Sequence, residues 1–231
     1  MLFSPQLPLP LEPRRIGGLD DFVVGPNVAV KGAVAEVSAD EDRSLYLYGP
    51  AGSGKTHLLN AACLAAREQG RTAFYLGLRG LGPGDSGALE GLEAMNLVCI
   101  DDLQRVAGQP AWEEALFHFI NRLRGQRGCL LVASRERLRR LPLALPDLAS
   151  RLAWGLRLEL QTLGDEDKRD VLEAHARSLG IELPAAVSDY LLRRGPRDMA
   201  TLVGLVTRLQ QAAFRDKRQV TVHLARQLMQ A

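Results

Sequence analysis

The chain has 231 residues, of which 46% are hydrophobic and 24% are charged, and its formal net charge is +2. This composition is typical of a folded globular protein, and the near balance of charge does not indicate the dense basic face that grips duplex DNA. The excess is not strongly localised, because residues 165–231 hold 11 Lys or Arg against 9 Asp or Glu. No apolar run approaches the roughly 18 residues of a membrane span, so we expect a cytoplasmic protein without a membrane partner.

The N-terminal segment, residues 1–13, contains prolines at positions 5, 8, 10 and 13. Proline fixes its own φ and restricts the residue before it, so it cannot continue a helix. The sequence therefore predicts an extended tail over residues 1–13.

The middle of the chain alternates short apolar runs with helical patterns. We expect strands at 45–49, 72–78, 96–102, 129–134 and 156–160, and helices at 27–37, 55–68, 88–94 and 111–124. The third strand is apolar on both faces, as parallel strands covered by helices are. This alternation predicts an α/β domain over residues 14–162 with a parallel five-stranded sheet and helices on both faces.

The composition changes after residue 162. Four helical patterns follow, over residues 164–180, 183–194, 196–217 and 220–230, with no strand between them. Acidic residues at 165–167 favour a helix start through the backbone dipole. We therefore expect a small all-helical C-terminal domain over residues 163–231.

A phosphate-binding loop follows the first predicted strand. Residues 49–56 read GPAGSGKT and match the pattern G-x-x-x-x-G-K-S/T between a strand and a helix. Small residues let the backbone N–H groups turn toward phosphate oxygens, and the helix N-terminus adds a favourable dipole. Lys55 would reach the β- and γ-phosphates and Thr56 would ligate Mg²⁺. The predicted nucleotide ligands are Gly49, Pro50, Ala51, Gly52, Ser53, Gly54, Lys55 and Thr56.

Two acids follow the third predicted strand, at Asp101 and Asp102. Side chains at the carboxyl ends of parallel strands face the crevice where ligands bind. We expect Asp101 to hold Mg²⁺ through water and Asp102 to orient or deprotonate the attacking water.

Together these features resemble the AAA+ superfamily, and within it the DnaA clade of replication-initiation ATPases. The resemblance is carried by GLDDFVVGPN at 18–27, GKTHLLNAA at 54–62 and ASRLAWGL at 149–156. It implies an AAA+ fold with a helical lid, ADP or ATP with Mg²⁺ as cofactors, and a possible homo-oligomer. It places an arginine finger, acting on a neighbour's nucleotide, on Arg151, and sensor 2 on Arg197.

The same resemblance implies that Asp21, Phe22 and Val23 begin the adenine pocket and that His57 belongs to the nucleotide site. One position departs from the clade, because Arg135 stands where an Asp is common. Ser134 is then the candidate for sensor 1.

The tail also carries a motif, since residues 6–11 read QLPLPL. This string resembles the peptide by which proteins dock on the bacterial sliding clamp, with partner-binding residues at Gln6, Leu7, Leu9 and Leu11. A clade member with this tail resembles the regulatory inactivators of the DnaA initiator. The resemblance implies that the protein docks on the DNA-loaded clamp, contacts DNA only indirectly, and stimulates hydrolysis of the initiator's ATP, which prevents re-initiation.

Two alternatives stay open at this point. The complete phosphate-loop and Asp-Asp motifs permit the chain to hydrolyse ATP by itself. A helicase-loader-like protein would instead bind single-stranded DNA, for which the basic residues 135–140 (RERLRR) are a candidate surface.

Overall fold

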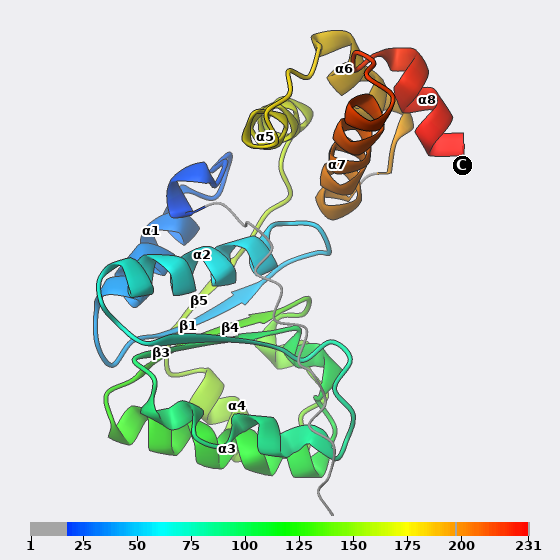
Figure 1. Ribbon diagram of the computed structural model, residues 1–231. Coiled ribbons are helices and arrows are strands. Elements are labelled where there is room, and N and C mark those ends of the chain that lie inside the picture. Colours follow the sequence, from blue (N-terminus) through cyan, green and yellow to red (C-terminus); the bar gives the residue numbers. More distant parts are fainter. Residues whose placement is uncertain (1–17, 197, 231) are drawn as a thin grey trace, which may run out of the picture.

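The computed structural model describes residues 18–196 and 198–230. Figure 1 shows a sheet between two layers of helices and, apart from it, a second group of helices that ends at the C-terminus. The five strands are all parallel, in the order β2-β3-β4-β1-β5. The predicted α/β fold with a five-stranded parallel sheet and a helical C-terminal domain is confirmed. The predicted tail, residues 1–13, lies outside the described residues.

The elements of the α/β domain follow the predicted order. The strands are β1 (Ser44–Tyr48), β2 (Ala73–Gly77), β3 (Leu97–Asp101), β4 (Cys129–Ser134) and β5 (Leu156–Glu159). The α-helices are α1 (Val28–Ala39), α2 (Lys55–Glu68), α3 (Pro110–Gly125) and α4 (Pro146–Leu152). Short 3-10 turns are η1 (Leu19–Asp21), η2 (Asp85–Leu89), η3 (Leu92–Ala94), η4 (Leu103–Arg105) and η5 (Leu138–Arg140).

Two of the three interior strands, β3 and β4, are buried along their whole length, which explains their unbroken apolar sequence. One core lies between the sheet and the helices α1 and α2, and includes Leu47, Leu58 and Leu131. The other lies between the sheet and the helices α3 and α4, and includes Trp112 and Phe119. Figure 1 shows these two helical layers on opposite faces of the sheet.

Two local predictions differ from the structure. The expected helix at 88–94 is two 3-10 turns, because Gly91 between them has a φ of 80°, which no α-helix accommodates. The helix α4 was not predicted, although Pro146 at its first position and Asp147 in its first turn are typical helix-start residues. Its seven residues are too few to give a clear periodic pattern.

A buried carboxylate fixes the position of α4. Glu113 on α3 is 1% exposed. Its Oε1 accepts from the backbone N–H of Gly108 at 2.6 Å and of Ala144 at 3.1 Å, and its Oε2 accepts from that of Leu145 at 2.7 Å. Because Leu145 directly precedes α4, this carboxylate ties α3 to the start of α4.

The C-terminal domain has its own core. Its helices are α5 (Asp165–Ser178), α6 (Ala185–Arg194), α7 (Met199–Arg215) and α8 (Val222–Gln230). They enclose a cluster that includes Leu172, Leu191, Val206 and Leu209. Within the described part of the chain, no helix is both long and apolar enough to cross a membrane.

Candidate nucleotide-binding site

The phosphate loop and the predicted residues at the ends of β3 and β4 converge on one edge of the sheet. Tyr48 at the end of β1 pairs with Ser134 at the end of β4, and Gly77 pairs with Asp101 at the end of β3. The phosphate loop follows directly after Tyr48, so the loop, Asp101 and Ser134 share the carboxyl edge. This is the edge where open parallel sheets bind ligands.

The phosphate loop is organised around Lys55. The loop leads through Gly54, with a φ of 100°, into α2, which begins at Lys55. The Lys55 ammonium donates to the carbonyl oxygens of Gly49 and Pro50, both at 2.7 Å, and to the hydroxyl of Ser53 at 3.2 Å. Burial lowers its pKa, an effect that the charges of Asp101 and Asp102 oppose and that of Arg135 reinforces. A single cation is thus held within the loop, where phosphate oxygens would meet it.

Replacing Lys55 with alanine should therefore lower the affinity for ADP by about 10- to 100-fold, since a charge-assisted bond to phosphate is lost. Titration calorimetry with ADP measures this, and a Lys31→Ala variant on α1 controls for loss of a lysine elsewhere. A Lys55→Ala protein that binds ADP as tightly as the parent would contradict the phosphate role.

The predicted magnesium ligands are in contact. The Thr56 hydroxyl donates to Asp101 Oδ2 at 2.5 Å, and Asp101 is 3% exposed. One hydroxyl and one carboxylate fit Mg²⁺, which takes few protein oxygens and completes its shell with water and phosphate. Tyr75, which the sequence did not single out, donates to the same carboxylate oxygen at 3.0 Å. Burial, and next the charge of Asp101, raises the pKa of Tyr75, so the phenol remains a donor that orients Asp101.

A second residue that the sequence analysis missed is Gln104. Its Nε2 donates to Asp102 Oδ1 at 2.6 Å, while its Oε1 accepts from the Ser134 hydroxyl at 3.1 Å and the Arg135 N–H at 3.0 Å. One amide therefore links the predicted water-orienting acid to the predicted sensor 1. Its signal in the sequence was weak, because a glutamine two residues beyond a strand-end acid has many solvated uses.

Of the predicted adenine-pocket residues, Phe22 packs against the start of α2. Phe22 is buried, and its ring centroid lies 5.7 Å from that of His57. His57 Nε2 is buried without a hydrogen-bond partner, and burial lowers the pKa of the ring. Val23 is half-buried beside Phe22 in the chain, and Asp21 closes η1.

The lid domain meets the phosphate loop at Gly52. A Cβ added to Gly52 would lie 3.0 Å from the backbone nitrogen of Met199 and 3.2 Å from the Cβ of Asp198. The start of α7 therefore packs directly against the loop, with Asp198 capping that helix by accepting from the Thr201 N–H. The predicted sensor 2, Arg197, lies outside the described residues.

Arg151 lies near the amino-terminal ends of the strands, whereas the phosphate loop lies at their carboxyl ends. It stands in the last turn of α4, shortly before β5. Gly155, the residue before β5, lies against Ser44 at the start of β1, because a Cβ added to Gly155 would lie 2.0 Å from the carbonyl oxygen of Ser44. The phosphate loop leaves the other end of β1, after Tyr48. The strand between them spans about 13–16 Å at 3.3 Å per residue, so Arg151 is remote from its own loop.

Aromatic rings hold the Arg151 guanidinium. Its Cζ lies 3.9 Å from the ring centroid of Trp154 and 5.6 Å from that of Phe117. Arg124 stacks on the same indole at 3.8 Å. Trp154 is 48% exposed. A guanidinium stacked on an exposed ring keeps its five N–H donors available for an anion.

Comparison with known proteins identifies the class. The model for the bacterial DnaA ATPase domain matches residues 14–76, and the model for the Hda lid domain matches residues 165–229. Among solved structures, domain III of Thermotoga maritima DnaA superposes with a TM-score of 0.80 at 23% identity, covering 92% of this chain and 95% of that one.

Two further structures share the fold. AMPPCP-bound DnaA from Aquifex aeolicus gives a TM-score of 0.70 at 23% identity, covering 86% of this chain and 66% of that one. The Thermotoga maritima RuvB branch migration motor gives 0.67 at 21% identity, covering 92% and 71%.

The fold and the site thus define a P-loop protein of the AAA+ class. More narrowly, the chain is similar to the DnaA clade in its N-terminal part and to the Hda lid in its C-terminal part.

Proposed function

We propose that this protein binds ADP or ATP with Mg²⁺ at its phosphate loop and stimulates ATP hydrolysis by a DnaA initiator while docked on the DNA-loaded sliding clamp. Arg151 acts on the initiator's nucleotide, where a guanidinium stabilises charge on the transferring phosphate. Hydrolysis inactivates the initiator and prevents re-initiation. The protein's own nucleotide sets the position of the lid, whose helix α7 packs on the loop at Gly52.

The observation that carries this proposal is the placement of Arg151. It lies at the sheet edge opposite its own phosphate loop and stacks on the half-exposed Trp154. A guanidinium so placed is remote from its own phosphate loop, and its N–H donors are available to a neighbouring molecule. An arginine finger in trans requires both properties.

Clamp docking is assigned to the tail residues Gln6, Leu7, Leu9 and Leu11, which lie outside the described residues. Extended segments dock by placing apolar side chains in a groove around a polar anchor. Tethering on the clamp would convert a weak encounter with the initiator into one at high effective concentration.

The test is to load labelled ATP on the cognate initiator and follow ADP formation with this protein and DNA, with and without the clamp. We expect acceleration that depends on the clamp. A Gln6→Ala variant should lose most of that dependence, because the polar anchor is removed, and should bind ADP like the parent. Acceleration that is equal without the clamp would contradict the docking role of the tail.

A second candidate function, autonomous ATP hydrolysis, is favoured by the contact between Thr56 and Asp101 and by the intact Lys55. Steady-state turnover by the isolated protein that is lost in Lys55→Ala would support it. A helicase-loader role would instead give salt-sensitive single-strand binding through residues 135–140 without clamp binding.

A further inference from the structure

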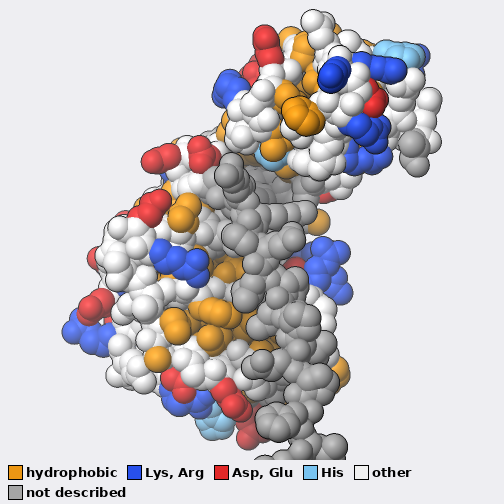
Figure 2. Space-filling view, viewed as in Figure 1, with side chains coloured by type: hydrophobic (Ala, Val, Ile, Leu, Met, Phe, Trp, Pro, Cys, Tyr) orange, Lys and Arg blue, Asp and Glu red, His pale blue; other side chains and the backbone are white. Residues whose placement is uncertain are grey.

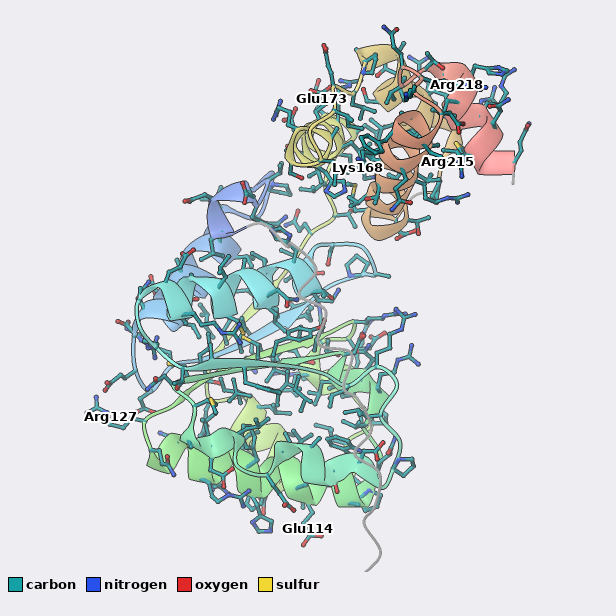
Figure 3. The ribbon with its side chains drawn as sticks, in the orientation of Figure 1. Glu114, Arg127, Lys168, Glu173, Arg215 and Arg218 are labelled. Atoms are coloured by element: carbon teal, nitrogen blue, oxygen red, sulfur yellow. The ribbon has the colours of Figure 1, made fainter. Side chains whose placement is uncertain are left out.

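The lid domain is electrically polarised, although its net charge is small. Five of its acids lie in α5, whereas residues 183–230 hold eight Lys or Arg against three Asp or Glu. Figure 2 shows Lys and Arg side chains gathered over the lid. In Figure 3, Glu173 lies on α5, while Arg215 and Arg218 lie on the far side of the lid near α7 and α8. The charge balance of residues 165–231 as a whole conceals this separation, which lies within the lid.

A hollow of about 650 Å³ lies between α6 and α8 on the basic side. It is lined by Ala186, Asp189, Tyr190, Arg193, Arg194, Val222 and Arg226. Its one carboxylate, Asp189, is already engaged by Arg169 of α5 in an ion pair. Any anion that enters would therefore meet three arginines and no free carboxylate.

These three arginines have no ion-pair partner among residues 18–196 and 198–230. Arg193 and Arg194 stand in the last turn of α6, where cations favour the helix dipole. The dipole does not account for Arg226, which stands in the middle of α8 and faces the same hollow. Three cations from two helices are held around one cavity without compensation.

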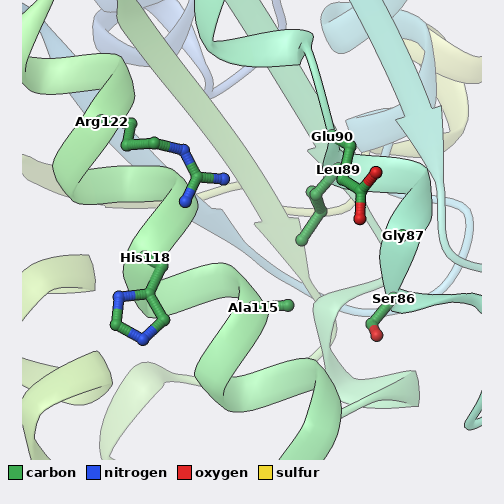
Figure 4. Close-up of a pocket in the computed structure, with 7 residues that line it drawn as sticks. All are labelled: Ser86, Gly87, Leu89, Glu90, Ala115, His118 and Arg122. Carbon is green, nitrogen blue, oxygen red and sulfur yellow. The ribbon is translucent and has the colours of Figure 1, made fainter.

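Another hollow shows the opposite arrangement. It measures about 210 Å³, lies between η2 and α3, and contains Arg122, His118 and Glu90 (Figure 4). Arg122 is paired there with Glu93 at 3.0 Å, and His118 faces Glu114 at 3.9 Å. Its basic side chains already have acidic neighbours, so it makes no comparable demand for an external anion.

We propose that the hollow between α6 and α8 binds the phosphate backbone of DNA. Arginine forks match phosphate oxygens in pairs, and several arginines spread over two helices suit a chain of phosphates better than a single anion. The half-buried ring of Tyr190 in the lining adds an aromatic face on which a base can stack. This site is separate from the phosphate loop and from Arg151, so it goes beyond the proposed function.

The test uses the full chain with saturating ADP, without initiator or clamp, and fluorescein-labelled single-stranded and duplex oligonucleotides. Anisotropy is recorded between about 50 and 200 mM salt, because the affinity of a phosphate-binding site falls with salt over this range. Arg193→Ala and Arg226→Ala should each lower the affinity at low salt by about tenfold. Each should also reduce the slope of log K against log salt by about 0.7 on single strands or 0.9 on duplex.

The matched control is Arg177→Ala, which removes an exposed lid arginine on α5 outside the hollow and should change the affinity less than about twofold. Thermal melting of each variant verifies folding. If Arg226→Ala is destabilised, Arg226→Gln removes the charge but keeps a polar side chain with part of the aliphatic stem. Tyr190→Leu keeps an apolar side chain but removes the aromatic ring. If this variant loses affinity for single strands and not for duplex, single-stranded DNA is the ligand. If it binds both oligonucleotides as tightly as the parent, duplex DNA is the ligand.

Three results would overturn the proposal. The first is the absence of salt-dependent DNA binding, and the second is an equal loss in Arg177→Ala. The third is a loss of DNA affinity in Arg139→Ala, in the basic stretch after β4, while the lid variants bind DNA as tightly as the parent. Because no initiator is present, each of these results leaves the proposed arginine-finger function untouched.

Discussion

Replacing Arg151 with alanine should lower clamp-dependent ATP hydrolysis by the initiator by about 1,000-fold or more, the usual effect of removing an arginine finger. The variant should keep its fold and its affinity for ADP and for the clamp. Arg151 makes no ion pair within the described residues, and its stacking on Trp154 contributes only about 0.5–1 kcal/mol at an exposed site. Single-turnover conversion of labelled ATP on the initiator measures the effect.

Arg124→Ala is the matched control for this experiment. Arg124 stacks on the same indole at 3.8 Å, so its removal also takes a guanidinium from Trp154 but leaves the proposed finger in place. We expect its rate to stay within about threefold of the parent, the range of a lost exposed contact. If Arg124→Ala and Arg151→Ala lose activity equally, stimulation depends on the surface around the Trp154 indole and not on an arginine finger. Stimulation that is retained in Arg151→Ala would contradict the assignment of Arg151 as the arginine finger.

Replacing Glu113 with alanine should lower the free energy of unfolding by about 2–4 kcal/mol, because three backbone N–H groups lose a charged acceptor. This is a large share of the roughly 5–15 kcal/mol that stabilises a domain. The released segment includes Leu145 before α4, so stimulation of the initiator should also fall as Arg151 loses its fixed position. Urea unfolding of the isolated protein gives the first quantity, and the single-turnover assay gives the second.

The neighbouring acid supplies the control. Glu114 is largely exposed, lies 3.9 Å from His118 Nε2, and is found below α3 on the outside of the domain in Figure 3. Glu114→Ala should change the unfolding free energy by less than about 0.5 kcal/mol. Equal losses of unfolding free energy in the two alanine variants would show that Glu113 does not fix the segment before α4. Glu113→Gln keeps the volume and one acceptor oxygen, and should fall between the parent and Glu113→Ala.

Most of the fold could be predicted because its signals are local. The helix at 55–68 and the strand at 129–134 match α2 and β4, since each is encoded by an unbroken pattern with a glycine or a charged residue at its ends. Element boundaries failed where a single conformation interrupted a pattern. Gly91 divides the expected helix at 88–94 into two turns, and α4 is too short to carry a period.

The candidate site divides in the same way. The phosphate loop is contiguous, and its function follows from residue size, the backbone turn and one lysine, all of which the sequence contains. The contacts of Tyr75 and Gln104 join residues that are 26 and 30 positions from their partners Asp101 and Ser134. No pattern in the chain predicts such a pair, because it depends on which strands become neighbours.

The sequence by itself therefore determined the class of protein, the layered α/β architecture, and the loop and carboxylates of the candidate nucleotide site. It also contained the separation of charge in the lid, which a finer division of residues 165–231 reveals. Only the tertiary structure decided that Arg151 faces away from its own loop, that Glu113 anchors α4, and that Arg226 joins the arginines of α6. The physical reason is that periodicity and composition act between neighbours in the chain, whereas these contacts follow from strand register and helix packing.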